Sequence, residues 1–589
     1  MSFHEALTQP PSIGSVVTGS ADANANANAN ANANGTIVPG SRTTIDVVLT
    51  LELGTHSFRH AETGQTFQIT APLFNGTFPG PTVYLDPGDV LRMTFSNDLP
   101  TTTGEEYQHN TISGLDQSNL HFHGLYVSSA APSDDVSIRV LAGESFDYVV
   151  TLPDNHLPGT HWLHPHRHGA VASQVGGGAA AAVIVKDTPL LLNNELPSYL
   201  ADAREEILIL QQFADREVLE IHERAIDLGL IEYSPSPFVT DELVLVNGQH
   251  QPFVKAVGIN EWIRFRVINS NVEREGLGIH IELADDNRCE MLLVAKDGIY
   301  VPCVPRVLVE GARIVPGGRA DLLVRCGEGG GVGTSDQFPL LISEGTPVLL
   351  MEQLVASTTN DEDIVPESWA PNFPAYLQDL QDTPAPEACS CTTILDDGAV
   401  NGREFQHDFI LHTSPLGSVV ERDIEAEDHP YHQHIYPFQL VELENANRGP
   451  EGYIQTGDWH DTFEGNALIR YQPQTFQDKI VLHCHRLEHE DEGMMSLEQI
   501  VEPEDQGGMC TCGAAPENSW PVWSIVLTAV LGVAAVLGVS WYVVRRRRLN
   551  EGESRREAQS KEAGVQPGVD AESQQKRNEV PLAVEAQNA

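Results

Sequence analysis

The hydrophobic and polar positions of this 589-residue chain alternate over short runs. Alternating or β-branched runs, such as residues 44–53, 90–95 and 262–268, are separated by turns rich in Gly, Pro, Asn and Asp. Such runs are typical of β-strands, and helical periodicity is scarce around the histidine-rich segments. A chain of this length forms about three or four domains. We therefore predict an all-β protein made of β-sandwiches.

Residues 520–544 have a different pattern. No charged residue occurs from 522 to 544, and Trp or Tyr residues lie near both ends. A helix of this length spans a bilayer core of ~30 Å, with aromatic anchors at the two interfaces. Four arginines, 545–548, follow directly, which favours a transmembrane helix over a buried soluble one. We predict a single-pass protein, in the plasma membrane, with residues 545–589 in the cytoplasm and the N-terminal part extracellular or lumenal.

The start of the chain does not supply the signal peptide that this topology requires. Residues 1–20 have no basic region followed by a continuous apolar segment, and we interpret the start as incomplete. The Ala-Asn repeat, 23–34, has nothing apolar enough to pack. We predict that this repeat is disordered and that residues 1–40 form a low-complexity leader. Asn34 and Asn75 begin glycosylation sequons, which makes a secreted eukaryotic form a glycoprotein.

The charge balance restricts the partners. The chain has 34 Lys and Arg against 83 Asp and Glu, a net charge of −49. Such a surface repels nucleic acid and anionic substrates and attracts cations. We therefore expect no nucleic-acid partner.

Four histidine-rich segments carry the candidate chemistry. They are residues 121–124, 161–169, 429–434 and 483–495. Each contains a His-x-His pair, and the two imidazoles of such a pair lie on one face of a strand. A single pair is weak evidence, because histidine pairs occur by chance on exposed strands. Four pairs, one of them flanking a cysteine, indicate metal binding.

The fourth segment combines ligands for two different metals. Cys484 is followed by His489 and Met494, at plus five and plus ten. A thiolate, two imidazoles and a weak axial thioether form the ligand set of a blue-copper electron-transfer site. His483 and His485 flank the cysteine, and in an extended strand they point to the opposite face. They are therefore expected to bind another metal.

The four segments resemble, in this order, the copper-binding motifs of the multicopper oxidases. The HPHxHG and HCHxLEHEDxGMM forms are similar to the laccase-like and bacterial copper-efflux branch, and the resemblance covers about residues 43 to 502. It implies three Greek-key cupredoxin sandwiches, with a trinuclear copper cluster between the first and the third. We place the first domain at 41–190, the second at 200–356, a linker at 357–390 and the third at 391–505.

The resemblance implies four copper ions. The implied type 1 ligands are His429, Cys484 and His489, with Met494 axial. The implied type 2 ligands are His121 and His432. The implied type 3 ligands are His123, His164, His166, His434, His483 and His485. All of the implied positions are occupied, which argues against a copper-binding or adhesion module that has lost catalysis.

The implied reaction couples four one-electron oxidations at the type 1 copper to reduction of O2 to water. Electrons pass from Cys484 through His483 and His485 to the trinuclear cluster. The reaction consumes protons, which nearby carboxyl groups relay. Glu490 occupies the position of a family proton donor, and Asp134 or Asp135 is another candidate. Ordinary loop acidity is the competing interpretation of these three residues.

The remaining histidines match no ligand position. We expect a supporting or surface role for His161 and His168, and packing for Met495. His109, His156 and His460 are interpreted as solvated loop histidines, although His460 lies beside Trp459 and Asp461, in a segment able to approach the type 1 site.

Cysteine spacing indicates disulfides at the ends of the third domain. Cys389 and Cys391 precede it, and Cys510 and Cys512 follow it. In an oxidising compartment these four cysteines are expected to form two disulfides, and the sequence does not determine which cysteines pair. The alternative is a copper-loading CxC site. Cys289, Cys303 and Cys326 leave one cysteine unpaired.

Two kinds of reducing substrate remain open. The first is a phenol or other organic reductant, as in laccases. The second is Fe²⁺, because Glu425, Glu427 and Asp428 precede His429 and form a possible metal-capturing group. A membrane ferroxidase of this kind would have membrane lipid, through 520–544, and a metal permease as further partners. A cuprous oxidase is disfavoured, since the chain has only seven methionines.

Overall fold

The structure is a computed structural model of the chain. It describes residues 5–13, 16–17, 42–103, 107–188, 196–213, 216–235, 243–254, 261–272, 278–284, 289–326, 336–343, 345–353, 366–384, 389–444, 449–503 and 510–512. The predicted transmembrane segment, the cytoplasmic tail, the Ala-Asn repeat and the Asn34 sequon lie outside these ranges. Within the ranges, no helix is long and apolar enough to cross a membrane.

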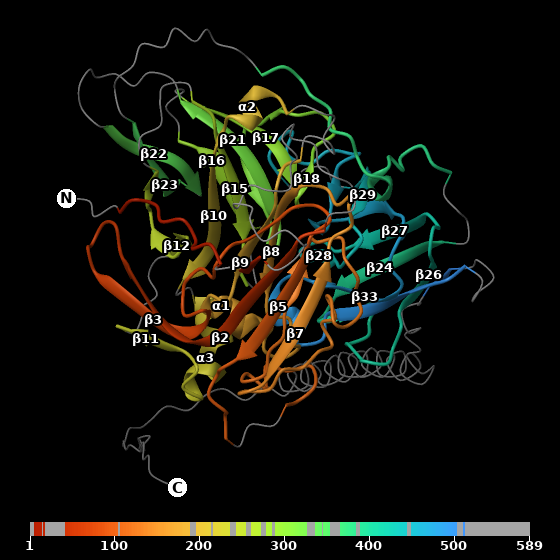
Figure 1. The fold of residues 1–589 in the computed structure, drawn as a ribbon, viewed down its shortest axis with the longest axis horizontal. Helices are drawn as coiled ribbons and strands as arrows, with labels where there is room; N and C mark the ends of the chain where they lie inside the picture. Colours follow the sequence, from red (N-terminus) through yellow and green to blue (C-terminus); the bar gives the residue numbers. More distant parts are fainter. Residues whose placement is uncertain are drawn as a thin grey trace, which may run out of the picture. The chain divides into compact units, whose positions relative to one another are not determined.

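The first domain packs two sheets against each other (Figure 1). In β2 and β5, buried side chains alternate with more exposed ones, because one face of this sheet covers the core. The larger sheet contains β1 (Val16–Val17), β2 (Thr44–Arg59), β3 (Thr66–Phe74), β5 (Val90–Asn97), β7 (Ser145–Thr151) and β11 (Glu232–Ser234). The smaller contains β4 (Val83–Leu85), β6 (His121–His123), β8 (Gly159–His164) and β9 (Ala181–Val185).

The second domain is also built of two sheets. One contains β10 (Arg204–Phe213), β12 (Leu243–Val246), β13 (Gln249–His250), β15 (Ile263–Asn269), β17 (Cys289–Lys296), β18 (Ile299–Tyr300), β19 (Arg306–Val307) and β21 (Arg319–Cys326). The other contains β14 (Phe253–Val254), β16 (Ile279–Leu283), β20 (Ala312–Ile314), β22 (Asp336–Ser343) and β23 (Thr346–Gln353).

The third domain repeats this plan with two six-stranded sheets. One contains β24 (Ser390–Asp396), β25 (Ala399–Val400), β27 (Val420–Glu425), β29 (Phe438–Leu443), β30 (Trp459–His460) and β32 (Ala467–Tyr471). The other contains β26 (His412–Pro415), β28 (Pro430–Gln433), β31 (Thr462–Glu464), β33 (Asp478–Cys484), β34 (Met495–Val501) and β35 (Thr511–Cys512).

Helices are short and few in the described ranges. They are α1 (Val171–Gly177), α2 (Ser198–Ala201), α3 (Arg216–Asp227), α4 (Leu487–Asp491) and a 3₁₀ turn, η1 (Ala375–Leu377). The prediction of an all-β fold is therefore confirmed. α4 is the one that matters for the site, because it follows β33 within the fourth histidine-rich segment.

Buried ion pairs fix the third domain on the second. Lys296 Nζ lies 2.6 Å from Asp458 Oδ2, and Arg319 Nη2 lies 2.6 Å from Asp461 Oδ2. All four side chains are almost completely buried. Removing one partner of such a pair leaves an uncompensated buried charge, at a cost of about 3–5 kcal/mol. The segment 458–464 is thus held firmly against the second domain.

Part of the predicted leader, 1–40, is described by the structure. Residues 5–13 are described, and Leu7 N–H donates to the Phe253 carbonyl at 2.8 Å. Thr82 N–H donates to the Pro11 carbonyl at 2.7 Å, and β1 pairs with β2. The predicted low-complexity leader, 1–40, therefore includes residues 5–13 and 16–17, which form backbone hydrogen bonds with later strands and turns. Their backbone hydrogen bonds connect the first and second domains.

Two parallel cross-links close the ends of the third domain. Cys389 is bonded to Cys510 and Cys391 to Cys512, so the prediction of two disulfides is confirmed and its open pairing resolved. Cys289 is bonded to Cys326 in the second domain, and Cys303 is the unpaired, exposed cysteine.

We predict that the two cross-links are redundant. Each closes a loop of the same sequence separation, 121 residues, so one bond constrains the unfolded chain almost as well as both. The variant C389S/C510S is expected to change the thermal unfolding midpoint little. Serine at all four positions should lower the unfolding free energy by about 2–5 kcal/mol, measured by calorimetry. A full loss in the two-site variant would contradict this account.

Candidate metal centre

Three donor atoms converge at one end of the third domain. Cys484 Sγ lies 3.5 Å from His429 Nδ1 and 3.8 Å from His489 Nδ1, and the two nitrogens are 3.2 Å apart. Metal–nitrogen and metal–sulfur bonds of about 2.0–2.3 Å fit inside this triangle. The donors are one thiol and two imidazoles, the set that suits copper.

Three separate elements bring these donors together. Cys484 ends β33, His429 precedes β28, and His489 lies on α4. β28 pairs with β33 so that Tyr431 stands opposite Cys484. Arg486 N–H points at the Cys484 sulfur at 3.4 Å. Met494 is fully buried, and its carbonyl accepts a hydrogen bond from Cys484 N–H.

This group is open on its imidazole side only. Cys484 is completely buried, whereas His429 and His489 are half-buried. Burial raises the pKa of the Cys484 thiol to about 12, so a metal ion that binds here displaces a proton. The solvent-accessible edge of this group is therefore formed by the two imidazoles.

A second group contains eight buried histidines. They are His121, His123, His164, His166, His432, His434, His483 and His485. His483 Nε2 lies 3.4 Å from His166 Nε2 and 3.3 Å from His434 Nε2. The Nε2 atoms of His121 and His432 are 3.5 Å apart, and His485 Nε2 lies 3.3 Å from His123 Nδ1.

Strand register places these rings. In the first domain, β6 pairs with β8 so that His121 stands opposite His164. In the third domain, β28 pairs with β33 so that His432 stands opposite His483. Each domain supplies four rings, and the group exists only where the two domains meet.

Hydrogen bonds on the outer side orient the rings. Four of the rings donate a hydrogen bond from Nδ1–H to an oxygen. The Nδ1–H of His121 donates to the Asp134 carboxylate at 2.9 Å. The other three donate to backbone carbonyls: His164 to Pro165 (2.9 Å), His432 to Asp461 (2.8 Å) and His483 to Cys484 (2.8 Å). This tautomer leaves the Nε2 lone pairs directed inward, as in metal-ligating histidines. The Nε2 atom of His164 is buried and has no hydrogen-bond partner in the described part of the chain. The site therefore fits metal ions.

The second domain closes the site from the side. Gly317 has a φ of +80°, and a Cβ there would lie 2.5 Å from the His485 ring. Arg319 forms a two-pronged contact with Asp461, which in turn lies 3.3 Å from His123 Nε2. The sequence did not single out Arg319 or give Asp461 a site role, because the contact joins positions 142 residues apart.

Two of the three predicted carboxyl groups reach the histidines. Asp134 holds His121, and Glu490 Oε1 lies 3.4 Å from His166 Nδ1. Burial raises the pKa of Asp134 to about 7 and raises the pKa of Glu490 strongly. Both can therefore hold a proton near neutral pH. Asp135 instead accepts hydrogen bonds from Ser137.

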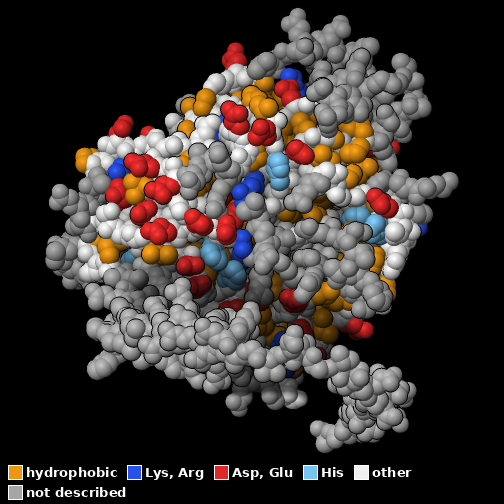
Figure 2. All heavy atoms as spheres, turned by 180° about the vertical axis from the view of Figure 1, so that it is seen from behind, with side chains coloured by type: hydrophobic (Ala, Val, Ile, Leu, Met, Phe, Trp, Pro, Cys, Tyr) orange, Lys and Arg blue, Asp and Glu red, His pale blue; other side chains and the backbone are white. Residues whose placement is uncertain are grey.

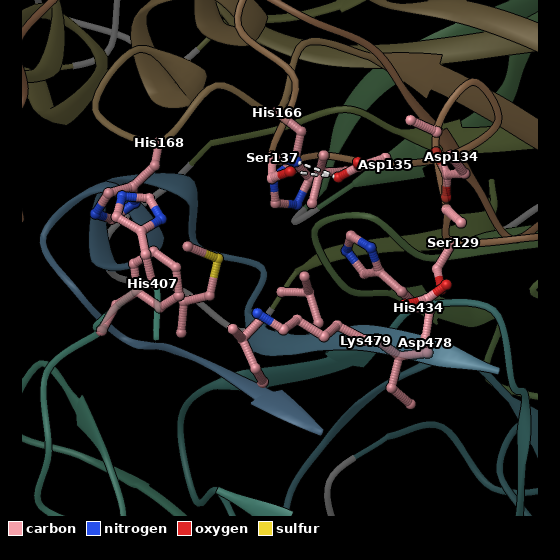
Figure 3. A pocket seen from close by; sticks show the side chains of 18 of the residues that line it. Ser129, Asp134, Asp135, Ser137, His166, His168, His407, His434, Asp478 and Lys479 are labelled. Carbon is pink, nitrogen blue, oxygen red and sulfur yellow. Dashed lines mark hydrogen bonds between the residues drawn. The ribbon is translucent and has the colours of Figure 1, made fainter. Parts of the chain in front are cut away.

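A cavity of about 220 Å³ lies between the first and third domains and reaches two of the eight histidines, His166 and His434. Its lining includes Asp134, Asp135, His166, His434 and Lys479 (Figure 3). Small molecules can approach the site along this cavity without passing the half-buried imidazoles of the first group.

Two predictions of solvated histidines are wrong. His156 and His460 are only 2% and 4% exposed. His156 accepts a hydrogen bond from Tyr126 N–H, and His460 lies 3.0 Å from Asp297 of the second domain. Packing between domains buries both rings, which local sequence does not reveal. His460 therefore joins two domains.

The other unassigned residues divide between core and surface. His161 and His168 are buried, and both nitrogens of His161 lack a hydrogen-bond partner in the described part of the chain. His109 is exposed, as expected. Met495 packs with Phe405, Val481 and Leu497, which confirms its packing role.

Two parts of the chain match known families. Residues 55–189 and 372–505 each match a family model described as multicopper oxidase. The laccase of Bacillus subtilis (strain 168) is 24% identical over 490 residues, which cover 73% of this chain and 90% of that protein. The cell division protein FtsP of Haemophilus influenzae (strain 86-028NP) is 28% identical over 261 residues. That match covers 44% of this chain. The chain therefore spans about half of that relative's length, 47%.

Solved structures show the same fold. A laccase from Pediococcus acidilactici superposes with a TM-score of 0.60 at 20% identity, over 85% of this chain and 95% of that one. A multicopper oxidase from Campylobacter jejuni, described as a metallo-oxidase, superposes with a TM-score of 0.54 at 18% identity. The superposition covers 84% of this chain and 95% of the Campylobacter jejuni chain. Both support the cupredoxin-like architecture.

We predict that Asp134, but not Asp135, controls metal binding at His121. The variant D134N removes the carboxylate that holds the His121 tautomer. Loss of such a supporting group lowers metal affinity about 10–100-fold. Copper content after dialysis against a graded series of chelator concentrations measures this affinity. D135N, one residue away, is the control, and equal copper retention in the two variants would refute the assignment.

Proposed function

Because this chain belongs to the multicopper oxidase family, we propose that it binds four copper ions and couples oxidation of a reducing substrate to reduction of O2 to water. One observation carries the proposal. Cys484 belongs to the three-donor group, and its neighbours His483 and His485 belong to the eight-histidine group. The two peptide bonds on either side of Cys484 thus join two centres of different composition.

The proposed ligand sets follow the family resemblance. His429, Cys484, His489 and Met494 would hold the type 1 ion. His121 and His432 hold the type 2 ion, and their Nε2 atoms are 3.5 Å apart. Of the type 3 pair, one ion is assigned to His166, His434 and His483, and the other to His123, His164 and His485. Copper in these positions supplies one-electron transfer at the first site and multi-electron reduction of O2 at the second.

The chain supplies orientation, connection and protons. The strand segment 483–485 is the shortest covalent path between the two groups. Burial raises the pKa of Glu490 well above its usual range, which favours its protonated form. It lies beside His166, within reach of the cavity that admits small molecules. Asp134 accepts a hydrogen bond from a different ring of the group, His121. Burial raises the pKa of Asp134 to about 7. These two groups are the proposed proton donors.

The reductant is proposed to be a phenol or another small organic molecule. Half-buried His429 and His489 offer an accessible edge for electron transfer, and the relative from Bacillus subtilis is a laccase. A copper-binding module without oxidase activity is a remote alternative, since one relative is a cell division protein. The complete set of ligands argues against that alternative.

Ferrous ion is the second candidate substrate. Glu425, Glu427 and Asp428 are exposed at the edge that carries His429. Asp428 and Asp396 are close enough to raise the pKa of His429, against the larger lowering effect of burial. Acidic side chains also spread over the face shown in Figure 2. The relative from Campylobacter jejuni is described as a metallo-oxidase.

We also propose that the chain is anchored in the plasma membrane by residues 520–544, with the oxidase outside. The uncharged run and the arginines that follow it support this proposal. Membrane lipid and a metal permease are the corresponding partners. Retention of the full-length chain in membranes after alkaline extraction would support the anchor, and release would refute it.

The oxidase proposal is tested at Cys484. The variant C484S removes the sulfur donor that distinguishes the first group. We expect it to lose the intense blue absorption band and O2 consumption with any reductant. Copper bound by the eight histidines should remain, because none of them is changed. Retained oxidase turnover in C484S would sink the proposal.

Substrate choice is tested at the acidic edge. The variant E425A/E427A/D428A is expected to raise KM for Fe²⁺ about tenfold or more if these carboxylates capture the ion, and to leave KM for a phenol unchanged. Steady-state O2 uptake with each reductant provides both values. The variant D202A, at an exposed acid of the second domain, controls for loss of negative charge. Unchanged kinetics with Fe²⁺ would favour the organic substrate.

A further inference from the structure

Three histidines from distant segments meet at one end of the cavity. His168 and His407 lie together at that end, and His166 and His434 lie further along it (Figure 3). The ring of His109 lies 5.5 Å from that of His168 and 5.2 Å from that of His407, between centroids. None of the three belongs to the ligand sets described above. We propose that they form a separate site for a divalent transition-metal ion, Cu²⁺ or Zn²⁺.

The spacing of the rings suits a shared ion. Two imidazoles that each bind one ion at about 2.0–2.1 Å with tetrahedral geometry have centroids about 5 Å apart. The observed separations match this value. The ring planes are inclined at 61° and 41°, so the rings are not stacked on one another. Metal ligands commonly converge in this way.

Hydrogen bonds fix the tautomers that a metal requires. His109 Nε2–H donates to the Phe405 carbonyl at 2.7 Å, and His168 Nε2–H donates to Asn110 Oδ1 at 3.0 Å. Asn110 is oriented in turn, because its amide nitrogen lies 3.3 Å from acceptors on Glu404 and Phe405. An imidazole held by its N–H on an oxygen presents the other nitrogen as a ligand.

The nitrogens left to coordinate an ion are the Nδ1 atoms. His168 Nδ1 is buried and has no hydrogen-bond partner in the described part of the chain. A buried polar atom in this state costs free energy, and a bound ion would remove that cost. His109 Nδ1 lies 3.2 Å from the Tyr107 hydroxyl, a long contact that a metal can replace.

Protonation and charge are compatible with a cation. Burial lowers the pKa of His407, which favours the neutral form of the ring that can coordinate a metal ion. Asp408 acts on His407 as a negative charge, and Arg167, stacked over Tyr107, acts as a positive one. The negative charges of Glu404 and Asp408 oppose the positive charges of Arg167 and Lys479, and Lys479 also acts on His407.

The donor set selects the class of metal. Neutral imidazoles suit Zn²⁺ and Cu²⁺, and Cu²⁺ forms the tighter complexes of the divalent ions. His407 is exposed, which gives an ion direct access from solvent. An ion held here sits at the entrance of the only route described above from solvent to His166 and His434. A bound ion at this position would therefore affect the movement of small molecules along the cavity.

The proposal is tested by adding Zn²⁺ to full-length protein already loaded with copper. We expect one additional Zn²⁺ per chain by calorimetric titration, with unchanged copper content before and after. The variants H407A and H109A should each bind this ion at least tenfold more weakly. H280A is the control, because His280 is a histidine of β16 whose Nε2 bonds the Glu310 carbonyl far from the cavity.

Each outcome is decisive. Loss of the extra ion in H407A and H109A, with retention in H280A, supports the site. Equal Zn²⁺ binding in all four proteins, or none in the unchanged protein, overturns it. Failure of the oxidase proposal would appear separately, as a missing blue band or a low copper content in the starting material.

Discussion

The alternation of side chains along one strand is the constraint on which the site depends. At the end of β33, Cys484 faces one side while His483 and His485 face the other. Two metal groups must therefore lie on opposite sides of the same backbone. The first group is completed within the third domain, by a residue before β28 and a residue on α4. The second group needs four more histidines, and these come from the first domain.

The histidines of the first and third domains must be positioned relative to one another to within a fraction of an ångström. Contacts from the second domain help to fix these positions. Arg319 binds Asp461 with two hydrogen bonds of 2.6 Å. The carbonyl of Asp461 accepts from His432, and its carboxylate lies beside His123. Lys296 and Arg306 hold Asp458 three residues earlier. A domain without any of the proposed copper ligands thus orients ligands of the other two.

The sequence predicted the parts that local patterns determine. Strands such as β2 follow from alternation, and the donors follow from the spacing around Cys484 and from the four His-x-His pairs. The two CxC motifs indicated disulfides but not their pairing. Burial of His156 and His460, the contact of Arg319 with Asp461, and the ordered residues 5–13 arise from packing between segments far apart in the sequence. Nothing in the local pattern around those residues distinguishes them from ordinary loops, which is why the solvated-histidine prediction was wrong.

The central claim is that one chain holds two copper groups joined through residues 483–485. Anomalous X-ray scattering at the copper absorption edge, from crystals of the copper-loaded protein, tests it most directly. The account predicts one peak among His429, Cys484 and His489, and three peaks among the eight histidines between the first and third domains. Copper at only one of these two places, or at neither, would contradict it.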